Sequence, residues 1–382
     1  MTFHVRRRAA HARAAYRPSA IVAIPVQDEG VDLGNILAAL GAQCDLHGHA
    51  LAPASVAVLL LFDGCSDARW ERMETLRGSH MPSWIAIDGD LPEASRHAGG
   101  ARRAALLKAL ALAAPETTLI ATTNADSMVP AMWLARQIDW LARGCEVVMG
   151  MAQRPTFDDM DPALESQHRL EMVYARWLDR IDAMLDPIDH DPWPRHRTPS
   201  SASLGFKREA LQAMLPLPAP AHAHEQALIQ RCVTLDLKIR ADANLQVHNP
   251  SLAALHAGGM RSNRPLPFEP LVHAVTRSIL RGQLRARHRA GTLSAETLTG
   301  SFAMPTEHAH AALKMPTFGR LWHEVEHSSP LLQHTPLLPS HLPREIEAAL
   351  AWFNACMAGS TGPSTLAPAK RQARKVASLD LS

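Results

Sequence analysis

The chain has 382 residues, 47% of them hydrophobic and 20% charged, which is enough apolar material for one large domain or two smaller ones. The net charge of +2 gives no general electrostatic reason to expect a nucleic-acid partner, and no apolar run reaches the roughly 18 residues of a membrane span. The five cysteines include no CxxC pair, a pattern typical of free thiols in a reducing compartment, so we expect a cytoplasmic protein.

Both ends of the chain differ in composition from the part between them. Residues 1–19 are basic and lack the apolar segment of a signal peptide, so we expect a loose basic arm. Residues 359–382 are poor in aromatic side chains and rich in Ser, Pro, Lys and Arg, which predicts a disordered tail. The patterns of the intervening residues favour an α/β domain over 20–260 and a helical extension over 261–358.

Short apolar runs alternate with helical patterns through the first part of the chain. Because each run is apolar on both sides of an extended chain, it predicts a buried strand. The alternation predicts a mostly parallel sheet with helices on both faces. Strands are predicted at residues 21–26, 55–62, 84–87, 118–121 and 146–150, and helices begin close to residues 33, 67, 100, 131 and 163.

Oxygen-bearing side chains follow three of the predicted strands. In a parallel sheet the carboxyl ends of neighbouring strands lie at one edge, where ligands bind. Carboxylate and amide oxygens are the ligands that Mg²⁺ and Mn²⁺ prefer, so this edge is a candidate cation site; alternatively, Asp126 caps the helix that follows it. The side chains are Asp28 and Glu29 after the first strand, Asp63 and Asp67 after the second, and Asn124 and Asp126 after the fourth.

The second half of the chain is predicted to be more helical. A loop rich in Pro, His and Asp, residues 186–197, has the composition of loops that line sites, although a plain surface loop fits it as well. The Pro- and His-rich stretch 300–343 is expected to be mostly irregular. Other predicted elements are helices at 163–185, from His224, within 265–290 and at 345–357, a strand leading into a helix at 200–208, and short strands at 237–239 and 245–247.

Residues 323–327 match the HExxH pattern, in which two imidazoles on one helix face bind zinc and the glutamate acts as a base. The histidines would be His323 and His327. Pro330 soon ends any such helix, and the 21 histidines of the chain make a chance match easy. We therefore favour a solvated helix turn, with a zinc hydrolase as the alternative.

Six short segments carry a further pattern, in a fixed order along the chain. Residues 24–29 read Ile-Pro-Val-Gln-Asp-Glu, 63–67 read Asp-Gly-Cys-Ser-Asp, and 100–103 read Gly-Ala-Arg-Arg. Residues 123–127 read Thr-Asn-Ala-Asp-Ser, 201–208 read Ser-Ala-Ser-Leu-Gly-Phe-Lys-Arg, and 224–231 read His-Glu-Gln-Ala-Leu-Ile-Gln-Arg. Together they resemble motifs of family 2 glycosyltransferases, which have the GT-A fold: Ile-Pro-Ala-x-Asn-Glu, Asp-x-x-Ser-x-Asp, Gly-x-Ala-Arg, Asp-x-Asp, Gly-Ala-Asn-Leu-Ala-Phe-Arg-Arg and Glu-Asp-x-x-Leu-x-x-Arg.

The resemblance, which runs from about residue 20 to residue 259, implies a Rossmann-like GT-A domain. Such a domain would take a nucleoside diphosphate sugar and transfer the sugar, with inversion, to an acceptor hydroxyl that the sequence does not identify. Glu225 aligns with the general base. Asp126 would hold Mg²⁺ or Mn²⁺ against the diphosphate, and His248 is a candidate further ligand. The implied donor-binding residues are Pro25, Glu29 and Asp67 at the base and ribose, Arg102 or Arg103 at the diphosphate, and Asn124 and Ser203.

The sequence departs from the family pattern at several of these positions. Asn124 replaces the first metal carboxylate, which lowers the affinity expected for a divalent ion, and Glu225 replaces Asp. No arginine follows Val247 until Arg261. The alternative is therefore a catalytically degenerate GT-A module that binds sugar nucleotide without transfer. A nucleotidyltransferase would need a Gly-rich basic loop after the first strand, where residues 27–30 are acidic instead.

Overall fold

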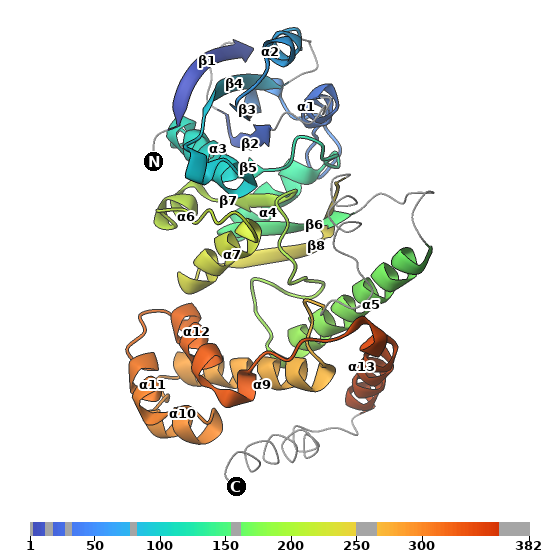
Figure 1. Cartoon of the computed structure of the whole chain (residues 1–382), viewed down its shortest axis with the longest axis vertical. Helices are drawn as coiled ribbons and strands as arrows, with labels where there is room; N and C mark the ends of the chain where they lie inside the picture. The colour runs from blue at the N-terminus through green and yellow to red at the C-terminus, as the bar shows by residue number, and fades with distance from the viewer. Residues whose placement is uncertain are drawn as a thin grey trace. The chain divides into compact units, whose positions relative to one another are not determined.

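The computed structural model describes residues 3–11, 18–26, 33–76, 82–153, 162–249 and 266–358. These residues form two compact units, whose elements are labelled in Figure 1. Unit 1 comprises the described residues up to 153 together with 196–249, and unit 2 comprises 162–195 with 266–358. Residues 162–195 therefore belong with the C-terminal helices, whereas the predicted boundaries put them in the α/β domain. The predicted tail, 359–382, lies outside the described residues.

Unit 1 is built on an eight-stranded sheet with the strand order β1-β4-β3-β2-β5-β7-β6-β8 (Figure 1). β1 and β7 run antiparallel to their neighbours, and the other strands run in one direction. The predicted α/β class with a mostly parallel sheet is confirmed. The strands are β1 (His4–His11), β2 (Ala20–Val26), β3 (Val56–Asp63), β4 (Ser83–Asp90), β5 (Leu119–Thr122), β6 (Val147–Gln153), β7 (Leu204–Phe206) and β8 (Ile239–His248).

Successive side chains of the strand β2 point to opposite faces of the sheet, and each set joins a separate hydrophobic core. Val22 and Ile24 pack in one core with α1, α2 and α4, whereas Ile21 and Ala23 pack in the other with α3, α6 and α7. Both faces are therefore covered, which explains why the strand is apolar throughout. The helices are α1 (Leu33–Gly41), α2 (Asp67–Glu74), α3 (Ala98–Leu112), α4 (Trp133–Ala142), α6 (Arg208–Ala213) and α7 (His224–Thr234).

Two predictions for unit 1 are wrong. The segment predicted as a loose basic arm contains β1, which pairs with β4 and whose side chains alternate between exposed and half-buried positions. Arg6 and Arg7 of this strand both donate to the carboxylate of Asp88, which is fully buried in β4. β8 is one strand in place of the two short strands predicted, with a shift in its pairing to β6 after Gly150.

Unit 2 is helical, as predicted for the C-terminal part, but residues 300–343 are more regular than expected. Pro305 lies immediately before α11, and the side chain of Thr317 caps α12. Phe302 and Trp322 share one hydrophobic core there, so these short helices are held by packing. No described helix is long and apolar enough to cross a bilayer. The helices are α5 (Pro162–Leu185), α9 (Leu271–Arg289), α10 (Ala295–Ser301), α11 (Thr306–Ala312), α12 (Phe318–Ser328) and α13 (Leu342–Met357).

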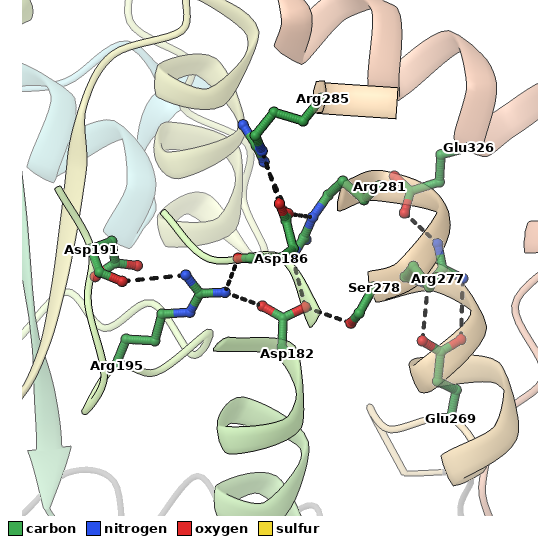
Figure 2. Close-up of polar contacts among 10 residues, drawn as sticks. All are labelled: Asp182, Asp186, Asp191, Arg195, Glu269, Arg277, Ser278, Arg281, Arg285 and Glu326. Atoms are coloured by element: carbon green, nitrogen blue, oxygen red, sulfur yellow. Dashed lines mark hydrogen bonds and ion pairs between the residues drawn. The ribbon is translucent and has the colours of Figure 1, made fainter. Parts of the chain in front are cut away.

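A buried network of ion pairs joins α5, the loop after it and α9 within unit 2 (Figure 2). Asp182, close to the end of α5, accepts hydrogen bonds from Arg195 at 2.7 Å and from Arg281 at 2.6 Å. Asp186 accepts hydrogen bonds from Arg281 at 2.6 Å and from Arg285 at 3.0 Å. Because removing a charge from water is costly, each carboxylate is stable in this position only while several donors hold it.

Replacing Asp182 with Asn should destabilise unit 2, because Arg195 and Arg281 would lose a buried negative partner. Breaking a buried ion pair typically costs about 3–5 kcal/mol. The control is Glu165→Gln, which breaks an exposed pair with Arg169 on the same helix and should change the free energy of unfolding by less than about 0.5 kcal/mol. Urea denaturation of the full chain, followed by circular dichroism, measures both changes. Equal effects of the two substitutions would contradict the prediction.

Burial alone would raise the pKa of Asp186, but the hydrogen bond from Arg285 and the charge of Arg281 outweigh it, so the pKa lies below its ordinary value of 3.8. A carboxyl group of this kind stabilises the fold above its unfolded pKa, and the contribution is lost as pH falls through the folded pKa. We therefore expect the free energy of unfolding to fall with acidification below about pH 4. Urea midpoints measured between pH 5 and pH 2.5 should show a shallower fall for Asp186→Asn; an unchanged slope would rule this contribution out.

Candidate functional site

The turn that follows β5 is fixed to two neighbouring segments. The Thr122 hydroxyl donates to the carbonyl of Ala23 in β2 at 2.7 Å. The Thr123 hydroxyl donates to a backbone carbonyl shortly before β7, at 2.8 Å. Both threonines are fully buried, so water does not compete for these bonds. The turn therefore holds Asn124 and Asp126, which are half-buried, at the carboxyl end of β5.

Arg102 of α3 is bound to this turn and is only 5% exposed. Its guanidinium donates to the Thr122 hydroxyl at 2.6 Å, to a backbone carbonyl at 3.0 Å and to Oδ1 of Asn124 at 2.5 Å. Burial lowers the pKa of Arg102 to about 10, and the charges of Glu225 and Asp126 oppose that change. Arg102 therefore stays charged at neutral pH, and both predicted functional carboxylates lie near enough to interact with its charge.

Glycine at the start of α3 allows α7 to approach closely. A Cβ atom on Gly99 would lie 2.3 Å from the carbonyl oxygen of Pro220 and 2.9 Å from Cβ of His224, too near for any side chain. Just before α7, Ala223 takes a positive φ of 53°, which residues other than glycine adopt rarely. This turn and the close packing set Glu225, the second residue of α7, beside the first turns of α3.

His224 is buried next to Glu225. Its Nε2 lies 3.4 Å from Oε1 of Glu225 and has no hydrogen-bond partner among the residues described. Burial lowers the pKa of His224, the charge of Glu225 opposes that effect, and the charges of Arg102 and His97 add to it. His224 is therefore neutral at pH 7, so Glu225 has an uncharged ring beside it.

His248, the last residue of β8, lies beside the turn after β5. Its backbone pairs with that of Met128 through hydrogen bonds of 2.8 and 3.2 Å. Asp126 precedes Met128 by two residues. The two side chains predicted to hold a cation, Asp126 and His248, are therefore on segments that lie next to each other.

The described residues do not form a metal centre by themselves. Among them, no group of three or more His, Cys, Asp or Glu side chains could hold a metal ion. The oxygen of Asn124 already accepts a hydrogen bond from Arg102. Mg²⁺ usually binds through one or two carboxylates together with waters and substrate phosphates. Asp126 has a carboxylate of the type that such an ion binds, and His248 lies on the neighbouring segment.

The remaining predicted donor-binding residues differ in their burial and in their hydrogen-bond partners. Pro25 is half-buried close to the end of β2. Arg103 donates to a serine hydroxyl in the turn before α3 at 3.4 Å. Ser203 is fully buried, and its hydroxyl accepts a hydrogen bond from the indole of Trp133 at 2.9 Å, so it is not accessible to a donor and we leave it out of the proposed site. Glu29 lies outside the described residues.

Arginines neutralise the acidic residues after β3 and in β4. Arg7 of β1 donates to Asp67 and to Asp88, both at 2.8 Å. The side chain of Asp67 is 91% exposed, so its predicted contact with a base or ribose stays a prediction. The two carboxylates proposed for chemistry, Asp126 and Glu225, lie on other elements, in the turn after β5 and in α7.

Two contributors to this edge have no recognisable signal in the sequence. His97 caps α3 by accepting a hydrogen bond from the backbone N–H of Gly100 at 3.1 Å, although histidine is not among the preferred capping residues. Arg7 pairs with residues about 60 and 80 positions away, a separation at which local patterns carry no information.

The HExxH segment lies on α12, and its side chains have other partners. Nδ1 of His327 is 2.8 Å from the backbone carbonyl of His323, and the Glu324 carboxylate is 3.1 Å from Nδ1 of His308 in α11. α12 ends at Ser328, as the following Pro330 suggested. These contacts favour the solvated helix turn over a zinc site.

Comparisons with known proteins give structural likeness without a family match. No protein-family model matches the chain, and no curated protein matches it significantly. Among solved structures, the mannosyltransferase PcManGT from Pyrobaculum calidifontis in complex with GDP-Man and Mn²⁺ is 16% identical, with 96% of this chain and 81% of that chain covered and a TM-score of 0.44. Residues 1–349 of S. aureus TarS in complex with UDP are 12% identical, with 89% and 91% covered and a TM-score of 0.42. These likenesses assign no role to a residue of this chain.

Gly99→Ala should destabilise unit 1 by about 1–3 kcal/mol, because the added methyl group forces α3 and the start of α7 apart. The matched control is Gly300→Ala in α10, where a Cβ atom would meet nothing within 4 Å. That substitution should be neutral or stabilise the chain by up to about 1 kcal/mol. Guanidinium denaturation of the full chain measures both. A Gly99→Ala chain as stable as the native one would refute the close approach.

Proposed function

We propose that unit 1 is a glycosyltransferase of the family 2, inverting kind, which moves a sugar from a nucleoside diphosphate sugar to an acceptor hydroxyl. The observation that carries the proposal is that two carboxylates interact with the same buried arginine. Asp126 after β5 and Glu225 in α7 both interact with the buried charge of Arg102. Glycosyl transfer needs this combination, because one group has to stabilise the negative charge of the diphosphate while another accepts a proton.

Glu225 acts as the general base in this mechanism. Its carboxylate takes the proton of the acceptor hydroxyl as the hydroxyl oxygen attacks the anomeric carbon. The bond from that carbon to the diphosphate oxygen breaks, and its electron pair leaves with the nucleoside diphosphate. Attack on the side opposite the leaving group inverts the anomeric centre. The neutral ring of His224 beside Glu225 adds no positive charge that would weaken the base.

Arg102 and Asp126 act at the diphosphate. The guanidinium of Arg102 is buried, so it acts on the diphosphate through its positive charge. Asp126, with His248, would hold a Mg²⁺ or Mn²⁺ ion, which when bound stabilises negative charge on the leaving group as a Lewis acid. Asn124 contributes by orienting Arg102 through its side-chain oxygen.

A module that binds sugar nucleotide without transferring the sugar is the second candidate. The observation that favours it is the hydrogen bond from Arg102 to Asn124. Because the oxygen of Asn124 is engaged and carries no charge, the turn offers a divalent ion one carboxylate where two would bind it more tightly. Turnover measurements separate this candidate from the first.

Glu225→Gln should slow sugar transfer by about 100-fold or more, since a general base contributes about 10²–10⁴ to the rate. Binding of UDP or GDP should stay within about twofold, because the change leaves the diphosphate contacts in place. Release of nucleotide from UDP- and GDP-sugars measures turnover, and calorimetry with UDP and GDP, with and without Mn²⁺, measures binding. Glu209→Gln, on the exposed part of α6, is the control.

The outcomes for Glu225→Gln are distinct. Unchanged turnover in the variant would remove Glu225 from the mechanism. Nucleotide binding without turnover in the native chain would favour the binding module. A native chain that binds neither UDP nor GDP would contradict both candidates.

A further inference from the structure

Unit 2 exposes a tryptophan that is flanked by two arginines. Trp193, in the loop after α5, is 38% exposed, and the guanidinium of Arg176 lies 5.0 Å from the centre of its ring system. Arg180, one turn further along α5, lies 5.9 Å from the same ring and 3.9 Å from the ring of Phe353 in α13. We call Arg176, Arg180 and Trp193 the tryptophan platform.

The two arginines of the tryptophan platform have no acidic partner. Within the part of the chain that the structure describes, the contacts of Arg176 and Arg180 are with aromatic rings only. Residues four apart on a helix lie on the same face, so their charges repel each other. Arg169 on the same helix is, by contrast, paired with Glu165. Two uncompensated guanidiniums at this spacing match a ligand with carboxylate or phosphate groups.

The loop that carries Trp193 is held firmly in place. Arg195, two residues further on, is buried and donates to the Asp182 carboxylate at 2.7 Å (Figure 2). It also donates to the backbone carbonyls of Asp186 at 3.0 Å and Asp191 at 3.3 Å. The loop is thus fixed to α5 on both sides of the indole. A large aromatic side chain kept at the surface by buried contacts is typical of a binding site.

We propose that the tryptophan platform binds a saccharide that carries anionic groups. The apolar face of a sugar ring packs on an indole, and guanidiniums beside it bind carboxylates or phosphates on the sugar units. The exposed indole of Trp193 makes no hydrogen bond within the described residues, so its N–H is free to bind a hydroxyl. Binding of this saccharide is a property of unit 2 and does not rest on the function proposed for unit 1.

A bilayer surface is the other class of partner that attracts tryptophan and arginine. Met172 and Met184 are exposed on the same helix, the first four residues before Arg176 and the second four residues after Arg180. A helix that lies on a membrane presents a wide, continuous apolar face, with its charges on the opposite side. On α5 the charges of Arg176 and Arg180 lie between the two methionines. This pattern favours a polar, anionic ligand.

The experiment compares three probes with the full chain. They are a hexamer of galacturonic acid, with one carboxylate on each ring, neutral maltohexaose, and vesicles of phosphatidylcholine with phosphatidylglycerol. Calorimetry should detect binding of the galacturonate hexamer to the chain. The chain should bind maltohexaose at least about tenfold more weakly, since a hydrogen bond to a charged group changes affinity by that order. Arg176→Gln should lower the affinity for the galacturonate hexamer about tenfold, and Arg169→Gln on the same helix should leave that affinity unchanged.

Arg176 is exposed, and among the described residues its one ring or charge contact is with Trp193, so Arg176→Gln tests the site without changing a buried side chain. Trp193→Ala should remove binding of the hexamer, with the melting temperature reported as a check on folding. Equal affinity for the two hexamers, binding of vesicles alone, binding of no probe, or an equal effect of Arg169→Gln would each overturn the proposal. Calorimetry with UDP and GDP on the same samples tests unit 1 separately. Nucleotide binding without hexamer binding overturns this inference alone, and the reverse result leaves it standing while contradicting the proposed function.

Discussion

The candidate site depends on the burial of one cation, the guanidinium of Arg102. A charged group removed from water is stable only when its donors are satisfied and opposite charges are close. The end of β5 satisfies the donors through the Thr122 hydroxyl, a backbone carbonyl and the oxygen of Asn124, and the charges of Asp126 and Glu225 favour the protonated form. Because these partners come from different elements, a shift of α3, β5 or α7 would leave the charge uncompensated. The hydrogen bonds of Arg102 fix α3 to the end of β5, and its charge interacts with the two carboxylates proposed for chemistry.

The carboxyl edge of the sheet is divided by charge. At β3 and β4, Arg7 of the first strand pairs with Asp67 and Asp88, so these acids are neutralised within the protein. At β5 and α7, the charge of Arg102 interacts with the two carboxylates Asp126 and Glu225, and its Nε–H has no partner among the described residues. This part of the edge thus combines a buried cation with two nearby carboxylates. This difference decides where along the edge chemistry is to be expected, because the sequence alone shows acids at both places.

The sequence predicted the fold where burial dictates the pattern. β2 is apolar because both of its faces are covered, and such an apolar run predicts a buried strand from the sequence alone. β1 was not predicted because its sequence, His-Val-Arg-Arg-Arg-Ala-Ala-His, does not alternate apolar and polar side chains, although its burial alternates, so this edge strand resembles a loose arm. The short helices near Pro305 and Thr317 were missed because proline reads as a break until its position before a helix is known. For the site, motif order indicated Asp126, Glu225 and either Arg102 or Arg103. It gave no sign that Arg102 binds Asn124 or that Ser203 is buried against Trp133, since such contacts join segments far apart in the chain.

Buried ion pairs add little net stability compared with apolar packing, so the network of unit 2 needs another explanation. Apolar side chains between the loop and α5 would allow several similar arrangements, because dispersion has no preferred direction. Arg195 is satisfied only where the Asp182 carboxylate and two backbone carbonyls converge, which leaves the loop one conformation. A loop fixed in this way loses no conformational freedom when a ligand binds, so more of the contact energy appears as affinity. Arg102 has the same effect at the end of β5, so in both units a buried arginine holds a loop in place.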